Sequence, residues 1–73
     1  MKNQYSILIQ WSQEDKKYIA SLPEFGPYAH THGNTYEEAL KNAQEVLELL
    51  IEDYQIRGKN LPLPSNLKLI MAV

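Results

Sequence analysis

Apolar and polar residues alternate in two short segments near the start of the chain, and alternation is the period of a β-strand. In residues 5–11 every second side chain is apolar and falls on one face, while Leu8 falls on the other face. A polar, charged stretch at 12–17 separates this segment from a second apolar run at 18–22. The two segments predict a hairpin, which Pro23 ends because proline has no N–H to donate to a sheet.

A short third strand is predicted at 28–32, and Gly33 and Asn34 are predicted to break it. The period of the apolar residues then changes to that of a helix. Thr35 and Glu38 have the spacing of a capping box, in which the Thr35 hydroxyl and the Glu38 carboxylate each accept a backbone N–H of the first turn. The helix is predicted over 36–57, and Gly58 suits the residue that follows its end. Its apolar residues recur every three or four positions and fill one arc, namely Ala39, Leu40, Ala43, Val46, Leu47, Leu50, Ile51 and Tyr54.

Residues 67–73 predict a last strand, which gives the order β-β-β-α-β in a single small domain covering 1–73. This is an α+β fold in which one amphipathic helix packs on one face of a small, largely antiparallel sheet. Because one helix covers only one face, Leu8 is expected on the uncovered side of the sheet. Seventy-three residues without cysteine make a marginal core, so self-association is expected to add stability.

Charge and hydropathy indicate where the protein is located and which classes of partner it binds. Seven basic residues stand against nine acidic ones, and the basic residues are scattered, which argues against direct binding of DNA or RNA. No stretch approaches the roughly 18 apolar residues that cross a membrane, and no signal-peptide pattern precedes residue 12. A soluble, cytoplasmic protein is therefore expected, with no membrane association.

No constellation of residues indicates an enzyme. His30 and His32 would share one face of a strand, but a zinc site needs three or four ligands and the chain has no cysteine, so we expect no metal. None of the serines lies in a Gly-x-Ser-x-Gly elbow, and the three glycines are too far apart for a phosphate loop. We therefore expect no catalytic residues and no cofactor.

The remaining candidate residues are of the kinds that bind another protein. Two apolar helix residues, Leu49 and Ile56, lie seven positions apart and away from the core arc, so they indicate either a contact surface or a solvated helix with incidental apolar residues. With Leu8 they are the candidates for self-association. The candidates for binding a partner are the aromatic turn, the nearby histidines and the acidic face of the helix, namely Phe25, Tyr28, His30, His32, Glu45, Glu48 and Glu52.

Several motifs stand in a recognisable order along nearly the whole chain. Leu22-Pro23-Glu24-Phe25 follows the hairpin, Gly33-Asn34-Thr35-Tyr36-Glu37-Glu38-Ala39-Leu40 opens the helix, and Gly58-Lys59-Asn60-Leu61-Pro62-Leu63-Pro64 follows it. In this order they resemble the HicB-like antitoxins of bacterial toxin–antitoxin pairs. The resemblance implies a partial ribonuclease-H-like β-β-β-α-β fold without the nuclease acids, and residues 5–11 indeed contain no carboxylate.

The resemblance also implies a function. A HicB-like protein binds a small, basic, mRNA-cleaving toxin of a HicA-like type and covers its active site, and family members tend to form dimers or tetramers. Many members carry a further C-terminal DNA-binding domain, whereas this chain stops at Val73, so a short form without operator binding is expected. The alternative is a solitary homo-oligomeric HicB-like module that has no toxin and binds another partner.

Overall fold

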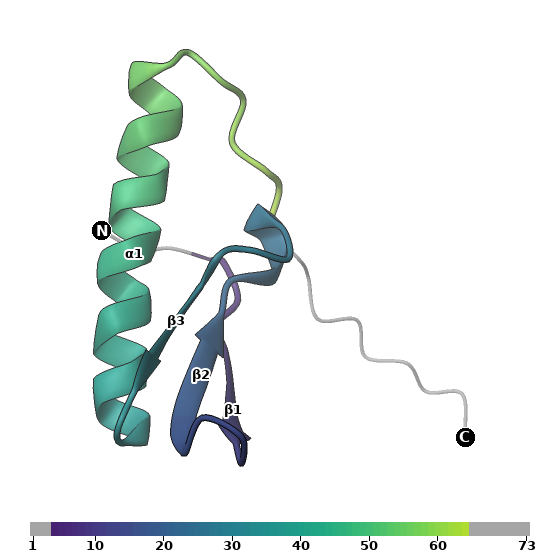
Figure 1. Ribbon diagram of the computed structural model, residues 1–73. Coiled ribbons are helices and arrows are strands. Elements are labelled where there is room, and N and C mark those ends of the chain that lie inside the picture. Colours follow the sequence, from purple (N-terminus) through teal and green to yellow (C-terminus); the bar gives the residue numbers. More distant parts are fainter. Residues whose placement is uncertain (1–3, 65–73) are drawn as a thin grey trace, which may run out of the picture.

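A computed structural model describes residues 4–64, which form three antiparallel strands and one long helix (Figure 1). Strand β1 (Leu8–Ser12) pairs with β2 (Lys17–Ser21), and β2 pairs with β3 (His30–Gly33), so that the sheet order is β1-β2-β3. Helix α1 (Tyr36–Ile56) then runs along one face of this sheet. The predicted α+β fold, with its β-β-β-α order, is confirmed; the predicted last strand at 67–73 lies outside the described residues.

The hairpin forms where the alternation predicts it, with its boundaries shifted by one to three residues. Regular pairing begins at Leu8, and Ser12 lies opposite Lys17 at the turn. Lys16 closes this turn with a positive φ of 55°. After β2, a short 3₁₀ helix η1 (Pro23–Phe25) redirects the chain, since a proline fits the first turn of a helix but not a strand ladder.

Helix α1 begins at its predicted cap, although one half of the capping box differs from the expectation. The Glu38 N–H donates to the Thr35 hydroxyl at 3.0 Å, which confirms Thr35 as the N-cap. The Glu38 carboxylate, however, accepts from the N–H of Asn34 at 2.6 Å rather than from that of Thr35. The side chain reaches one residue further back and ties the end of β3 to the first helical turn.

The end of α1 is a Schellman motif. Gly58 has a φ of 68°, the left-handed conformation that glycine adopts without steric cost. Its N–H donates to the carbonyl of Gln55 at 3.2 Å, and the N–H of Lys59 donates to the carbonyl of Tyr54 at 2.9 Å. The helix therefore ends at Ile56, one residue before the predicted boundary, with its last carbonyls satisfied.

The core lies between α1 and the strands β2 and β3. The buried helix residues Ala39, Ala43, Leu47 and Ile51 recur every four positions and face Ala20 and Leu22 of the β2 side. The small side chains at the start of the helix allow a close approach to β3. A Cβ at Gly33 would lie only 2.4 Å from the backbone nitrogen of Ala39, so only glycine fits there. Gly33 is thus a buried part of β3 and not, as predicted, the break after it.

After α1 the chain returns towards the start of β1. Leu61 packs against the core. The hydroxyl of Tyr5 donates to the carbonyl of Pro62 at 2.6 Å, which joins the segment before β1 to the segment after α1. Residues 5 and 62 are thus neighbours in space although nearly the whole chain separates them.

Candidate protein-interaction surface

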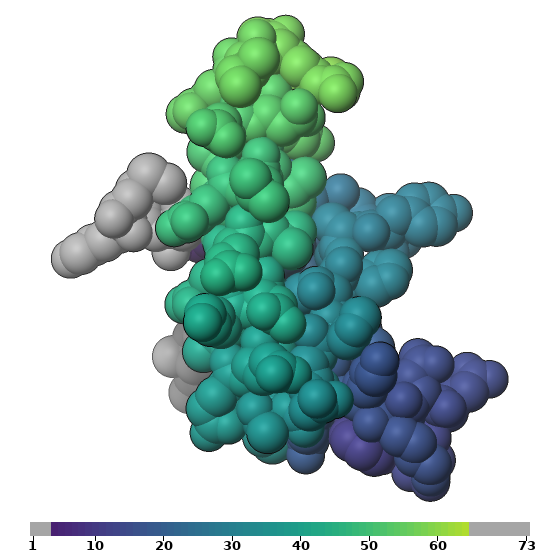
Figure 2. Space-filling model, turned by 60° about the vertical axis from the view of Figure 1, so that its left-hand side comes forward, coloured from purple at the N-terminus to yellow at the C-terminus, as the bar shows by residue number. Residues whose placement is uncertain are grey.

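The outer face of α1 carries three glutamates and two large apolar side chains, all exposed. Glu45, Glu48 and Glu52 follow one another at spacings of three and four residues, and Leu49 and Ile56 lie beside them on the same side of the helix. We call these five residues the acidic helix face. In Figure 2 the helix stands in front of the sheet, and no other described segment crosses its forward surface.

The two faces of α1 differ sharply in exposure. Leu47, on the inner face, is 3% exposed, whereas Leu49 is 64% and Ile56 is 78% exposed. Within residues 4–64 the ion pair on this helix joins Arg57 to Asp53, at 3.0 Å, and does not involve the three glutamates. Within the described residues, the three glutamates of the acidic helix face thus make no ion pair and lie beside exposed apolar groups.

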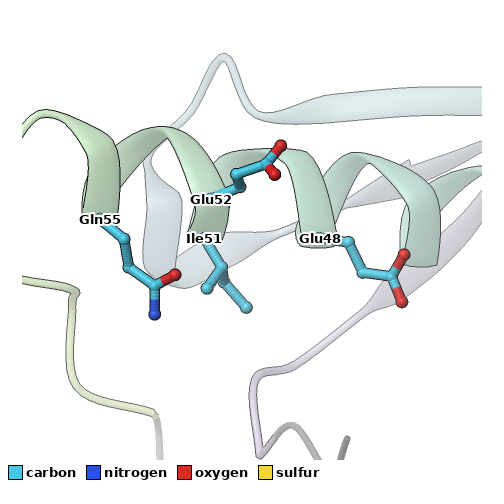
Figure 3. Close-up of a pocket in the computed structure, with 4 residues that line it drawn as sticks. All are labelled: Glu48, Ile51, Glu52 and Gln55. Atoms are coloured by element: carbon cyan, nitrogen blue, oxygen red, sulfur yellow. The ribbon is translucent and has the colours of Figure 1, made fainter.

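Two shallow pockets lie along this surface. One, of about 450 Å³, is lined by Glu45, Glu48, Leu49 and Glu52. The other, of about 280 Å³, is lined by Glu48, Ile51, Glu52 and Gln55; Figure 3 shows Glu48, Ile51 and Gln55 directed to one side of the helix and Glu52 to the other. All the lining residues that belong to the described part of the chain come from α1. Each pocket is lined by both carboxylate and apolar side chains, a combination that suits the aliphatic stem and cationic head of a lysine or an arginine.

The two aromatic candidates of the turn after β2 have different environments. The ring of Phe25 is half-buried and packs edge-on against Tyr5 and Tyr54, with ring centroids 5.0 and 5.6 Å away. Phe25 therefore joins the chain before β1, the turn and the end of α1. Tyr28, by contrast, is 88% exposed, so its side chain is available to a partner.

The histidines lie on the sheet face opposite α1. His30 is paired with Ser21 and His32 with Ile19, and this register puts both imidazoles on the same face as Leu8, which is paired with Ser21 from the other side. Both histidines are exposed. Among residues 4–64, no group of three or more side chains capable of holding a metal comes together. The expected position of Leu8 on the uncovered side is confirmed, and its side chain is 49% exposed.

The structure brings together residues that the sequence assigned to two different roles. Leu49 and Ile56, predicted for self-association, lie among Glu45, Glu48 and Glu52, which were predicted for binding a partner. A symmetric contact between two copies through this face would bring six carboxylates together, so its charge suits a cationic partner better than a second copy. Leu8, the third self-association candidate, lies on the opposite side of the molecule with the histidines.

One exposed aromatic cluster has no counterpart in the sequence prediction. The rings of Trp11 and Tyr18 lie 5.0 Å apart, and those of Tyr18 and Tyr36 lie 4.4 Å apart. Trp11 is 49% exposed although it belongs to the apolar face of β1. The reason is that α1 packs mainly on β3 and β2 and reaches β1 least. The alternation predicts on which face of the sheet a side chain lies, but it does not predict how far the helix covers that side chain.

Comparison with known proteins gives one informative similarity. Over 49 residues the chain is 37% identical to a UPF0150 protein of Thermotoga maritima, a match that covers 67% of this chain and 64% of that protein. The chain thus spans less than two thirds of the length of this relative, whose name states no activity or partner. No family model and no solved structure matches the chain. Among the described residues, no helix is long and apolar enough to span a membrane.

Proposed function

We propose that this protein is a HicB-like antitoxin that binds a small, basic, mRNA-cleaving toxin of a HicA-like type and covers its active site. The observation that carries the proposal is the acidic helix face, on which Leu49 and Ile56 are exposed among three glutamates that make no ion pair within the described residues. The order of motifs along the chain supports the antitoxin assignment, and so does the strand and helix order that the structure shows.

The geometry suggests how such a surface would neutralise a nuclease. Carboxylates on a rigid helix attract a basic protein at long range and orient it, while apolar groups at the centre of the contact supply affinity when they are desolvated. A surface that binds RNA is itself basic, so an acidic helix laid across it competes directly with the substrate. Inhibition would therefore be steric and electrostatic, without covalent chemistry and without a metal.

The aromatic turn extends the proposed contact beyond the helix. Tyr28 is almost fully exposed, and tyrosine is common in the centres of protein interfaces because its ring offers contact area at a low entropic cost. Phe25 contributes indirectly, since its ring packs between Tyr5 and Tyr54 and holds the turn in place.

A solitary homo-oligomeric module is the second candidate function, and the sheet favours it. Within residues 4–64 nothing packs on the face that carries Leu8, His30 and His32, and Leu8 is 49% exposed there. Self-association through this face would leave the acidic helix face free, so an oligomeric antitoxin and a solitary module differ only in whether a toxin exists.

Co-purification of the tagged chain from its native host, followed by mass spectrometry, tests the proposal. We expect a small basic protein that cleaves mRNA, and we expect the chain to suppress that cleavage at equal molar amounts. The purified complex should weaken as salt rises and should be insensitive to EDTA. A partner without nuclease activity, or a nuclease that the chain does not inhibit, would contradict the antitoxin assignment and leave the solitary module.

Two variants test whether the toxin binds the acidic helix face. Replacing Glu45, Glu48 and Glu52 together by glutamine removes three charges and keeps the size of each side chain. Replacing Glu14 and Asp15 of the hairpin turn by their amides removes charge from another exposed site and serves as the control. Loss of inhibition in the first variant alone places the toxin on α1, whereas equal loss in both would indicate general charge attraction.

A further inference from the structure

The two histidines of the chain lie on the same strand and point to the same side of the sheet. His30 and His32 are separated by one residue of β3, and they are paired with Ser21 and Ile19 of β2, both uncharged. This register puts both imidazoles on the face opposite α1, where both are exposed. Neither imidazole makes a hydrogen bond or an ion pair with residues 4–64, so both are available to a ligand.

The backbone that carries the two imidazoles is held on both sides. One side of β3 is paired with β2. On the other side, the side-chain amide of Asn42 donates to the carbonyl of His32 at 2.8 Å, and the N–H of His30 donates to the carbonyl of Tyr28 at 3.2 Å. Because the helix and the neighbouring strand both fix β3, the spacing and the direction of the two histidines are set before any ligand binds.

This spacing suits the chelation of one metal ion. Alternate residues of a strand lie about 6.6 Å apart along the chain. Two nitrogen ligands of a tetrahedral zinc ion lie about 3.4 Å apart, since each Zn–N bond is about 2.1 Å long. Each imidazole therefore has to lean towards the other by about 1.6 Å, which an exposed side chain achieves by rotation about its own bonds. Neutral imidazole is also the commonest metal ligand in proteins.

One chain supplies only half of the ligands of a closed zinc site, which has four. Among residues 4–64, no third side chain capable of holding a metal joins the two histidines. The sheet face around them is open within the described residues, and Leu8 is 49% exposed on it. In a two-fold symmetric contact through this face, a second copy adds the same two imidazoles, which gives four nitrogen ligands and covers Leu8 as well.

We propose that His30 and His32 form half of a site for a divalent transition-metal cation of the zinc type, and that a second copy of the chain completes it. Imidazole nitrogens suit zinc, copper and nickel. The ligand count of a single chain predicts no metal site, whereas two copies together offer four ligands. The site and the acidic helix face lie on opposite sides of the sheet, so the cation controls self-association and leaves the helix face free for a different partner.

A zinc titration of the chain, prepared without a histidine tag, tests the site and its second half together. Sedimentation velocity should show a monomer in EDTA and a dimer with zinc chloride, with the end point at one zinc ion per two chains. Because the chain has two histidines, their imidazole protons are readily followed by NMR, and both sets should shift during the titration. One zinc ion per chain without dimerisation, a dimer that persists in EDTA, or binding at millimolar zinc only would each overturn the proposal.

Two variants and a matched control assign the ligands. His30→Gln and His32→Gln each remove one imidazole from an exposed position, so both should keep the urea midpoint of the unmodified chain and lose zinc-dependent dimerisation. The control replaces Glu45, Glu48 and Glu52 by glutamine, because carboxylates also bind zinc. This control should dimerise with zinc as the unmodified chain does. Loss of the dimer in the control, or its retention in either histidine variant, would overturn the assignment.

Discussion

The two faces of α1 differ in how closely their residues are fixed by the rest of the fold. On the inner face, Ala39 and Ala43 are fully buried, and the backbone of the helix lies so close to β3 that Gly33 has no space for a side chain. On the outer face, Leu49 and Ile56 are more than half exposed among glutamates that make no described ion pair. The inner face is shaped by packing, whereas nothing in the described fold requires the apolar residues of the outer face. Residues that folding does not require are the ones to examine for binding.

The largest effect is expected at the closest contact of the inner face. Gly33→Val would push a side chain into the backbone of Ala39, 2.4 Å from the Cβ position, where no flexible group can give way. We expect a loss of about 4 kcal/mol or more in the free energy of unfolding, enough to unfold much of the protein. Asn34→Ala is the control, because its N–H still reaches Glu38. A Gly33→Val protein with an unchanged urea midpoint would show that α1 does not approach β3 this closely.

The same substitution on the two faces gives the most direct comparison. Leu47→Ala empties a site that is 3% exposed and should cost about 3 kcal/mol through lost burial and a cavity. Leu49→Ala removes a side chain that is 64% exposed, and its effect on stability should stay within about 0.5 kcal/mol. Urea denaturation of both variants measures the difference. Similar losses at the two positions would mean that the outer face is covered in solution, and the dependence of the Leu49→Ala loss on protein concentration would reveal by what.

The start of the helix provides a smaller test. Thr35→Ala removes the hydroxyl that accepts the N–H of Glu38 at 3.0 Å and should lower the free energy of unfolding by about 1 kcal/mol. Thr35→Ser keeps the acceptor and should restore most of the stability in a thermal melt. If Thr35→Ser is as unstable as Thr35→Ala, the methyl group of Thr35, and not its hydrogen bond, stabilises the protein at this position.

Local signals account for much of this fold. The alternation in residues 5–11, the Thr35 cap and Gly58 are each readable because a short stretch of chain fixes its own conformation. The same signals failed at Gly33, since a glycine that permits close packing looks the same in the sequence as a glycine that breaks a strand. They also failed at Trp11, whose half exposure depends on which strands the helix covers. That relation joins residues far apart and has no local pattern.

The candidate site was predicted residue by residue but not as one surface. The helical period correctly removed Leu49 and Ile56 from the core, and it placed the glutamates opposite the core. Two separate roles were predicted for these two sets because each set had its own chemistry. The structure shows them side by side on the acidic helix face, and their shared charge then favours a cationic partner over a second copy. The angular spacing needed for this conclusion was already in the sequence; the exposure of each side chain was not.

The smallest effect is expected on the outer face, and its sign distinguishes a binding residue from a structural one. Glu48 has like charges three residues before it and four residues after it, and like charges at these spacings destabilise a helix. Glu48→Gln should therefore raise the free energy of unfolding by about 0.5 kcal/mol while it weakens the complex with a basic partner. Glu37→Gln is the matched control, because Glu37 lies in the first turn, where the helix dipole favours a negative charge, and its loss should lower stability by a similar amount. If the native Glu48 lowers stability but strengthens binding, only binding to the partner explains why a glutamate is present at this position. If Glu48→Gln destabilises the protein as Glu37→Gln does, the Glu48 carboxylate makes a stabilising contact within the fold. The outer face of α1 would then also be shaped by folding, and the contrast between the two faces would not hold.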